Sequence, residues 1–113
     1  LDAQTVYHPD AVRAADLVLA KLGYGIVTEC IAHRVPIAHP PRADFPEHEV
    51  LEQETRRHVP LYPISESDFF SGRWDFMYDV FKDHMNLCLY LELESTCLDG
   101  GRAAADCLLE LIK

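Results

Sequence analysis

The chain is short of positive charge, of paired cysteines and of long apolar runs, and each shortage excludes a class of protein. Its 10 Lys and Arg against 19 Asp and Glu give a formal net charge of −9. That balance disfavours nucleic acid and anionic membrane surfaces as partners, since both recruit clustered Lys and Arg. No stretch approaches the roughly 20 apolar residues that cross a bilayer, and no secretory signal pattern is present. We therefore expect a cytoplasmic protein without a membrane span.

Cysteine and histidine are not arranged as metal or disulfide sites. The four cysteines, which form no C-x-x-C pair, are Cys30, Cys88, Cys97 and Cys107. Apolar neighbours flank Cys30 and Cys107, so we expect buried free thiols rather than disulfides. The six histidines show no His/Cys spacing of the usual zinc type, so we expect no metal and no cofactor.

Length and pattern predict one α/β domain. Residues 1–113 suit a single domain, and because residue 1 is Leu rather than Met we expect a processed form or a fragment. We expect strands at 4–8, 17–20, 36–39 and 59–64, and helices at 11–15, 26–33, 47–58, within 74–91 and at 102–113. Strands that alternate with helices favour a mainly parallel sheet in a partial Rossmann-like, three-layer arrangement.

Two expectations concern the C-terminal part of the chain. We expect Asp99-Gly100-Gly101 to break the chain before the last helix. That helix should turn its apolar side chains inward, namely Ala104, Leu108, Leu109 and Ile112. The Met and aromatic residues between Trp74 and Leu91 should form core rather than a cofactor site.

The most informative stretch is Gly23-Tyr24-Gly25, which lies between a predicted strand and a predicted helix. Glycines allow a sharp turn with positive φ, so we expect a valine at Gly25 to reduce both stability and binding. The free N–H groups of a helix N-terminus favour a phosphate, and Glu29 follows about one turn later. Neither a dinucleotide fingerprint nor a Walker A loop is present, and Gly-x-Gly alone is also typical of a plain tight turn.

A second loop is expected at the same edge of the sheet. Three prolines make the stretch 40–46 an extended loop rather than a helix. Ligands of parallel sheets bind beyond the carboxyl ends of the strands. We therefore expect residues 23–29 and 42–48 to form one site.

Read together, these segments resemble a known enzyme family. The order Gly23-Tyr24-Gly25-Ile26-Val27-Thr28-Glu29, Val35-Pro36, Arg42, Phe45 and Glu47 is similar to a pattern of GT-B glycosyltransferases. The likeness is to the glycosyltransferase-like domain that occurs alone or fused to GHMP-type sugar kinases. The segments 68–74 and 99–104 resemble later motifs of the same family, in the same order.

The resemblance implies a fold and a set of roles. It implies the second half of a GT-B C-terminal domain, which binds the nucleotide-sugar donor. It places Gly23, Tyr24, Gly25, Thr28 and Arg42 at the donor diphosphate, with Arg42 either near the phosphates or bracing the loop. It places Glu29 at the ribose, and Glu47 and His48 at the donor sugar.

Three positions depart from the family pattern, and two other functions remain open. Ile26 replaces a usual Thr, Arg34 a usual Gly and His48 a common Glu. The catalytic base of such enzymes lies on the other domain, so we expect it on a missing N-terminal acceptor domain or a partner chain. The alternatives are a non-catalytic nucleotide- or sugar-binding module of a sugar kinase, and a degenerate structural domain. An exposed apolar edge would then favour a homo-oligomer.

Overall fold

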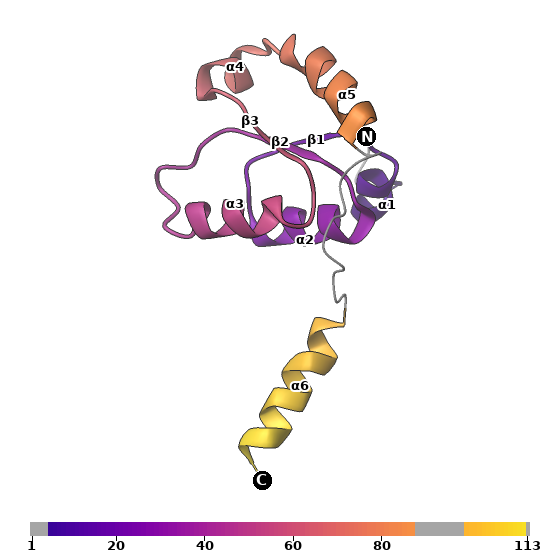
Figure 1. Ribbon diagram of the computed structural model, residues 1–113, viewed down its shortest axis with the longest axis vertical. Coiled ribbons are helices and arrows are strands. Elements are labelled where there is room, and N and C mark those ends of the chain that lie inside the picture. The colour runs from indigo at the N-terminus through magenta and orange to yellow at the C-terminus, as the bar shows by residue number, and fades with distance from the viewer. Residues whose placement is uncertain (1–4, 88–98, 113) are drawn as a thin grey trace.

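The computed structural model describes residues 5–87 and 99–112 (Figure 1). Its centre is an all-parallel sheet of β1 (Val18–Leu19), β2 (Ile37–His39) and β3 (Leu61–Pro63), in the order β1-β2-β3. One face is covered by α1 (His8–Arg13), α2 (Tyr24–His33) and α3 (His48–Arg56). On the other face lie α4 (Glu66–Ser71) and α5 (Phe76–Leu87). The predicted parallel α/β, Rossmann-like fold is confirmed.

The central strand β2 holds the layers together. Ile37 pairs with Val18 on one side and with Leu61 on the other, and it is fully buried. Such a continuous buried run is typical of a parallel strand covered on both faces. Pro63 is tolerated in β3 because that strand lies at the edge of the described sheet.

The main core lies between the sheet and helices α1 to α3. Its buried members come from all of these elements and their loops: Val12, Leu22, Val27, Cys30, Val35, Ile37, Leu51, Val59 and Leu61. The thiol of Cys30 is free and buried there, as the sequence predicts. On the opposite face, Val80 of α5 is buried and Phe76 and Met77 are partly buried, whereas Trp74 and Tyr78 are exposed. The core predicted from the Met and aromatic residues of this segment is therefore confirmed only in part. Cys88 to Leu91 and Cys97 lie outside the described residues.

Helix α2 ends where the sequence departs from the family pattern. Arg34 follows its last residue with φ 57°, in the left-handed region that glycine adopts most easily. The N–H of Val35 donates to the carbonyl of Cys30 at 2.9 Å, and the N–H of Arg34 donates to that of Ile31 at 3.2 Å. These two hydrogen bonds close the helix in a Schellman arrangement, so an arginine occupies a position that favours glycine.

The prediction for the N-terminal residues was wrong in part. Thr5 to Tyr7 form no strand, and a helix already begins at His8 with Pro9 in its first turn. Proline fits there because the N–H groups of the first helical turn have no intrahelical partner. The helix predicted at 11–15 therefore begins three residues earlier, and Asp10 lies inside its first turn.

The prediction for the C-terminal helix was also wrong in two respects. Helix α6 (Gly100–Leu111) includes both glycines, with Asp99 accepting a hydrogen bond from the N–H of Arg102 at 3.4 Å. The apolar side chains expected to turn inward are exposed, among them Leu108 and Ile112. Cys107, expected to be buried, is exposed as well. Figure 1 shows α6 apart from the sheet and its helices.

Within the described residues, no helix is both long enough and apolar enough to cross a membrane.

Candidate functional site

Two loops meet at the carboxyl edge of the sheet. β1 and β2 are parallel, so the loops that follow them, at 20–23 and 40–47, leave the same edge. A guanidinium nitrogen of Arg42 donates to the carbonyl oxygen of Leu22 at 2.9 Å. The same group lies 4.4 Å from the ring centre of Phe45, which makes an edge contact with Tyr24 at 6.2 Å. The segments that the sequence assigned to one site are therefore neighbours.

The first turn of α2 is open at this edge. Gly23 precedes the helix in extended backbone, and no side chain caps the N-terminus. A Cβ added at Gly23 or Gly25 would meet no other atom within 4 Å. The first N–H groups of a helix have no intrahelical partner, so this turn offers donors and a positive dipole end to an anion.

The glycines are used differently from the sequence expectation. Neither Gly23 nor Gly25 has a positive φ, and Gly25 lies within the helix. The expected strain of a valine at Gly25 was therefore wrong. What the two glycines provide is space in front of the N–H groups rather than an unusual backbone angle.

Two of the residues expected to bind the ligand make polar contacts with other residues of the chain. The hydroxyl of Thr28 donates to the carbonyls of Tyr24 and Gly25, at 2.9 and 2.8 Å. A carboxylate oxygen of Glu29 lies 2.7 Å from Nδ1 of His8, on α1. Glu29 is thus anchored toward α1, while its side chain keeps about a third of its surface exposed.

The two residues expected at the donor sugar differ in their exposure and contacts. Glu47 is exposed and forms the N-cap of α3 without a side-chain capping bond. His48 is turned toward the end of β2, where its ring centre lies 5.5 Å from that of His39. Its Nε2 lies 3.6 Å from a carboxylate oxygen of Glu52. Only 14% of the side chain of His48 is exposed.

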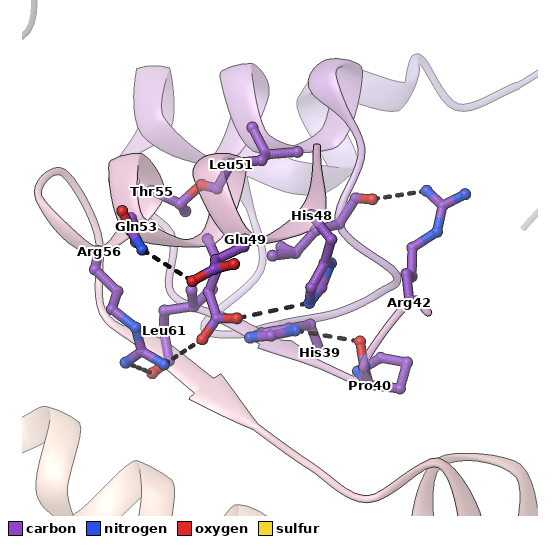
Figure 2. A network of polar contacts seen from close by, with 12 residues as sticks. His39, Pro40, Arg42, His48, Glu49, Leu51, Gln53, Thr55, Arg56 and Leu61 are labelled. Atoms are coloured by element: carbon purple, nitrogen blue, oxygen red, sulfur yellow. Dashed lines mark hydrogen bonds and ion pairs between the residues drawn. The ribbon is translucent and has the colours of Figure 1, made fainter. Parts of the chain in front are cut away.

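His39 is the polar residue that the sequence reasoning missed (Figure 2). It is 2% exposed, and its Nδ1 lies 3.2 Å from the carbonyl oxygen of Pro40. Burial lowers the pKa of His39; the hydrogen bond to Pro40 and the charge of Glu52 act in the opposite direction. A hydrogen bond from Arg56, at 2.6 Å, lowers the pKa of Glu52. This end of the sheet therefore holds a neutral imidazole beside an ionised carboxylate.

Lys21 was also missed as a member of this edge. Its ammonium lies 5.3 Å from the ring centre of Phe70, an exposed aromatic residue on α4. The signals were the place of Lys21 directly after one predicted strand and that of His39 at the end of another, where parallel sheets collect polar residues.

Charge and geometry at this edge suit an anion better than a cation. Lys21, Arg42 and the open turn of α2 supply positive potential. Within residues 5–87 and 99–112, no group of three or more His, Cys, Asp or Glu is arranged to hold a metal ion.

Comparison with known proteins gives one relative. No family model matches the chain, and no solved structure matches it. A stretch of 72 residues, 64% of the chain, is 31% identical to L-arabinokinase of Arabidopsis thaliana. The chain spans only 7% of the length of that protein. The chain is therefore distantly similar to one part of a much larger protein that is named as a sugar kinase.

Proposed function

We propose that this chain is the donor-binding part of a GT-B type glycosyltransferase and that it binds a nucleoside diphosphate sugar. The observation that carries the proposal is the uncapped first turn of α2, which opens beside the loop anchored by Arg42. The partial similarity to L-arabinokinase supports it, since the sequence resembles a glycosyltransferase-like domain that occurs alone or fused to sugar kinases.

The diphosphate would lie against the first turn of α2. Its oxygens would accept hydrogen bonds from the N–H groups at Tyr24 and Gly25, in the space that the glycines leave. Lys21 and Arg42 would add positive charge on either side of this turn. When the bond to the sugar breaks, the same groups would stabilise the leaving diphosphate, because its negative charge grows at that moment.

Glu29 would receive the ribose. A carboxylate accepts hydrogen bonds from two neighbouring hydroxyls, and the contact with His8 would fix its position. Glu47, exposed at the start of α3, would face the donor sugar. The base that activates the acceptor hydroxyl would come from another domain or another chain.

Calorimetric titration with UDP, GDP and dTDP tests this assignment. We expect saturable binding of one of them, and a loss of about tenfold or more in affinity for Glu29→Ala, since a charge-assisted hydrogen bond contributes about 1.5–3 kcal/mol. Glu110→Ala, which removes the same charge from the exposed face of α6, is the matched control and should bind like the wild type. Equal affinities of the two variants would remove Glu29 from the site.

A second function has one observation in its favour, the name of the relative. L-arabinokinase is named as a kinase and not as a glycosyltransferase, and this name favours a module that senses nucleotide or sugar for a kinase. Such a module would bind the same nucleotide without turnover. Incubation of a nucleotide sugar with the chain, alone and as part of any longer protein that contains it, distinguishes the glycosyltransferase from the sensing module. Only the glycosyltransferase releases nucleoside diphosphate when an acceptor is added.

A further inference from the structure

The cluster at the end of β2 contains two buried imidazoles that are not fully hydrogen bonded. Within the described residues, Nε2 of His39 and Nδ1 of His48 are buried and have no hydrogen-bond partner. A carbonyl oxygen only accepts, so Nδ1 of His39 must carry the proton that it donates to Pro40. In the neutral ring, Nε2 of His39 therefore carries a lone pair that is buried and accepts no hydrogen bond.

The surroundings of His39 decide what this lone pair can take up. Within the described residues, the charged and titratable groups that act on it come from α3, and they are His48, Glu52 and Arg56. Arg56 is held in place by Glu52 at 2.6 Å and by the carbonyl of Leu61 at 3.4 Å. The other carboxylate oxygen of Glu52 lies 3.6 Å from Nε2 of His48, so Glu52 contacts both this arginine and one of the two rings. One carboxylate thus faces one permanent cation and two sites for a further proton.

Protonation changes the balance of this cluster. With both rings neutral, the negative charge of Glu52 and the positive charge of Arg56 compensate each other. A proton on Nε2 of His39 would place a second positive charge in a buried position, in a ring whose centre lies 5.5 Å from that of His48. A buried charge without a hydrogen-bond partner is costly where water is excluded. The residue that can move is His48, because His39 is fixed in the sheet.

His48 is connected to the loop before it. The N–H of His48 donates to the carbonyl of Phe45 at 3.0 Å, and the N–H of Phe45 donates to that of Arg42 at 3.3 Å. Arg42 in turn donates to the carbonyl of Leu22, directly before α2. A movement of His48 is therefore transmitted along a continuous set of contacts to the entry of α2.

We propose that His39, His48 and Glu52 form a proton-operated switch that sets the position of the loop at 40–47. At neutral pH the two rings lie against each other at an interplanar angle of 56°, and the loop is held by His48. In mild acid the cluster takes up a proton, His48 leaves its place, and the loop loses its anchor on α3. The switch goes beyond the proposed nucleotide site and does not depend on it.

The first test is an NMR pH titration of the wild-type chain, which follows the imidazole Cε1–H and the backbone amides. A group that is kept neutral by burial gives stability that is fully present above its unfolded pKa of about 6.5 and is lost as the pH falls below it. We expect the pKa of His39 to lie below the ordinary imidazole value of about 6.5, and the amides of residues 40–48 to shift with the midpoint of His39. A midpoint for His39 at or above about 6.5, or amides that do not follow it, would overturn the proposal.

Two variants make the test independent of folding yield. His39→Asn keeps a donor for Pro40 but cannot titrate. Between about pH 7.5 and about pH 5.5, the midpoint of urea unfolding should therefore fall by at most half as much as it does in the wild type. His33→Asn is the matched control, and its midpoint of urea unfolding should fall with pH as much as that of the wild type. Glu52→Gln removes the carboxylate that favours the protonated ring, so the midpoint of His39 should move further down. An unchanged or raised midpoint in Glu52→Gln would contradict the role of Glu52, and an unchanged fall in His39→Asn would contradict that of His39.

Discussion

The sheet region, residues 8–64, and helix α6 use the same kinds of residue with opposite results. Both contain Leu, Ile, Ala and Cys at helical or strand spacing. In the sheet region Leu22, Ile37 and Cys30 are fully buried, whereas Leu108 and Leu111 of α6 and Ile112 directly after it are 63–80% exposed. Apolar spacing thus predicts where an element forms, but burial depends on whether a complementary surface lies beside it.

The difference follows from connectivity. Short loops join β1, α2, β2, α3 and β3, so each apolar face meets its neighbour at once. Helix α6 has no such neighbour among the described residues, and none of its side chains is buried. Its stability then rests on local terms such as the Asp99 cap. The comparison predicts large effects for substitutions in the sheet region and small effects in α6.

The largest effect is expected for Ile37→Ala. Its side chain is fully buried in the central strand, so truncation should lower the free energy of unfolding by about 2–5 kcal/mol. Leu111→Ala, at 80% exposure, is the matched control and should change it by less than about 0.5 kcal/mol. Urea unfolding followed by tryptophan fluorescence measures both. Equal losses would show that α6 is packed as firmly as the sheet.

The two described thiols sharpen the same comparison. Burial, with the charge of Glu29 adding to it, raises the pKa of Cys30 to about 11, whereas Cys107 is exposed. Because the thiolate is the reactive form, Cys107 should react with a disulfide reagent at neutral pH at least about a hundredfold faster than Cys30. Peptide mapping by mass spectrometry gives both rates. In urea the two rates should converge, and convergence without urea would place Cys30 at the surface.

Arg42→Leu tests the link between the two loops. The variant keeps an apolar contact with Phe45 but leaves the carbonyl of Leu22 without its donor. We expect a loss of about 1 kcal/mol in the free energy of unfolding and changed amide signals at the start of α2. Arg13→Leu, exposed at the end of α1, should do neither. Unperturbed amide signals at residues 22–26 in Arg42→Leu would show that Arg42 does not link the two loops.

The smallest effect is a gain in stability. Arg34 has φ 57°, which costs a residue with a Cβ more than it costs glycine. Arg34→Gly should therefore raise the free energy of unfolding by about 0.5–1 kcal/mol. His33→Gly, one residue earlier and inside the helix, should lower it by about 1 kcal/mol. Two losses of similar size would mean that the left-handed angle at Arg34 carries no strain.

Elements defined by neighbouring residues were predictable from the sequence. The strands around Val18, Ile37 and Leu61 and the helices between them follow from apolar spacing and proline punctuation. The parallel sheet followed from their alternation, and that sheet brought the loops of Gly23 and Arg42 together. For the long-range contact from Arg42 to Leu22, the sequence suggested only a role of Arg42 in holding its loop in place, and it did not identify the partner residue.

Features that depend on contacts far apart in the sequence were not predictable. The pairing of His39 with His48 needs the exact angle at which α3 packs on β2, and no spacing rule encodes that angle. The same holds for His8 beside Glu29, which joins two helices. The burial of α6 was mispredicted because its pattern describes an apolar face without saying what covers it.

The most direct test of the account is an NMR titration of the labelled chain with UDP, GDP and dTDP, with inorganic pyrophosphate as a fourth ligand. The account predicts saturable shifts at residues 23–29 and 42–48 for one nucleotide, smaller shifts at the start of α2 for pyrophosphate, and none in α6. Absence of shifts at residues 23–29 with every ligand, on a folded chain, would contradict the claim that the open turn of α2 and the loop of Arg42 form a nucleotide site.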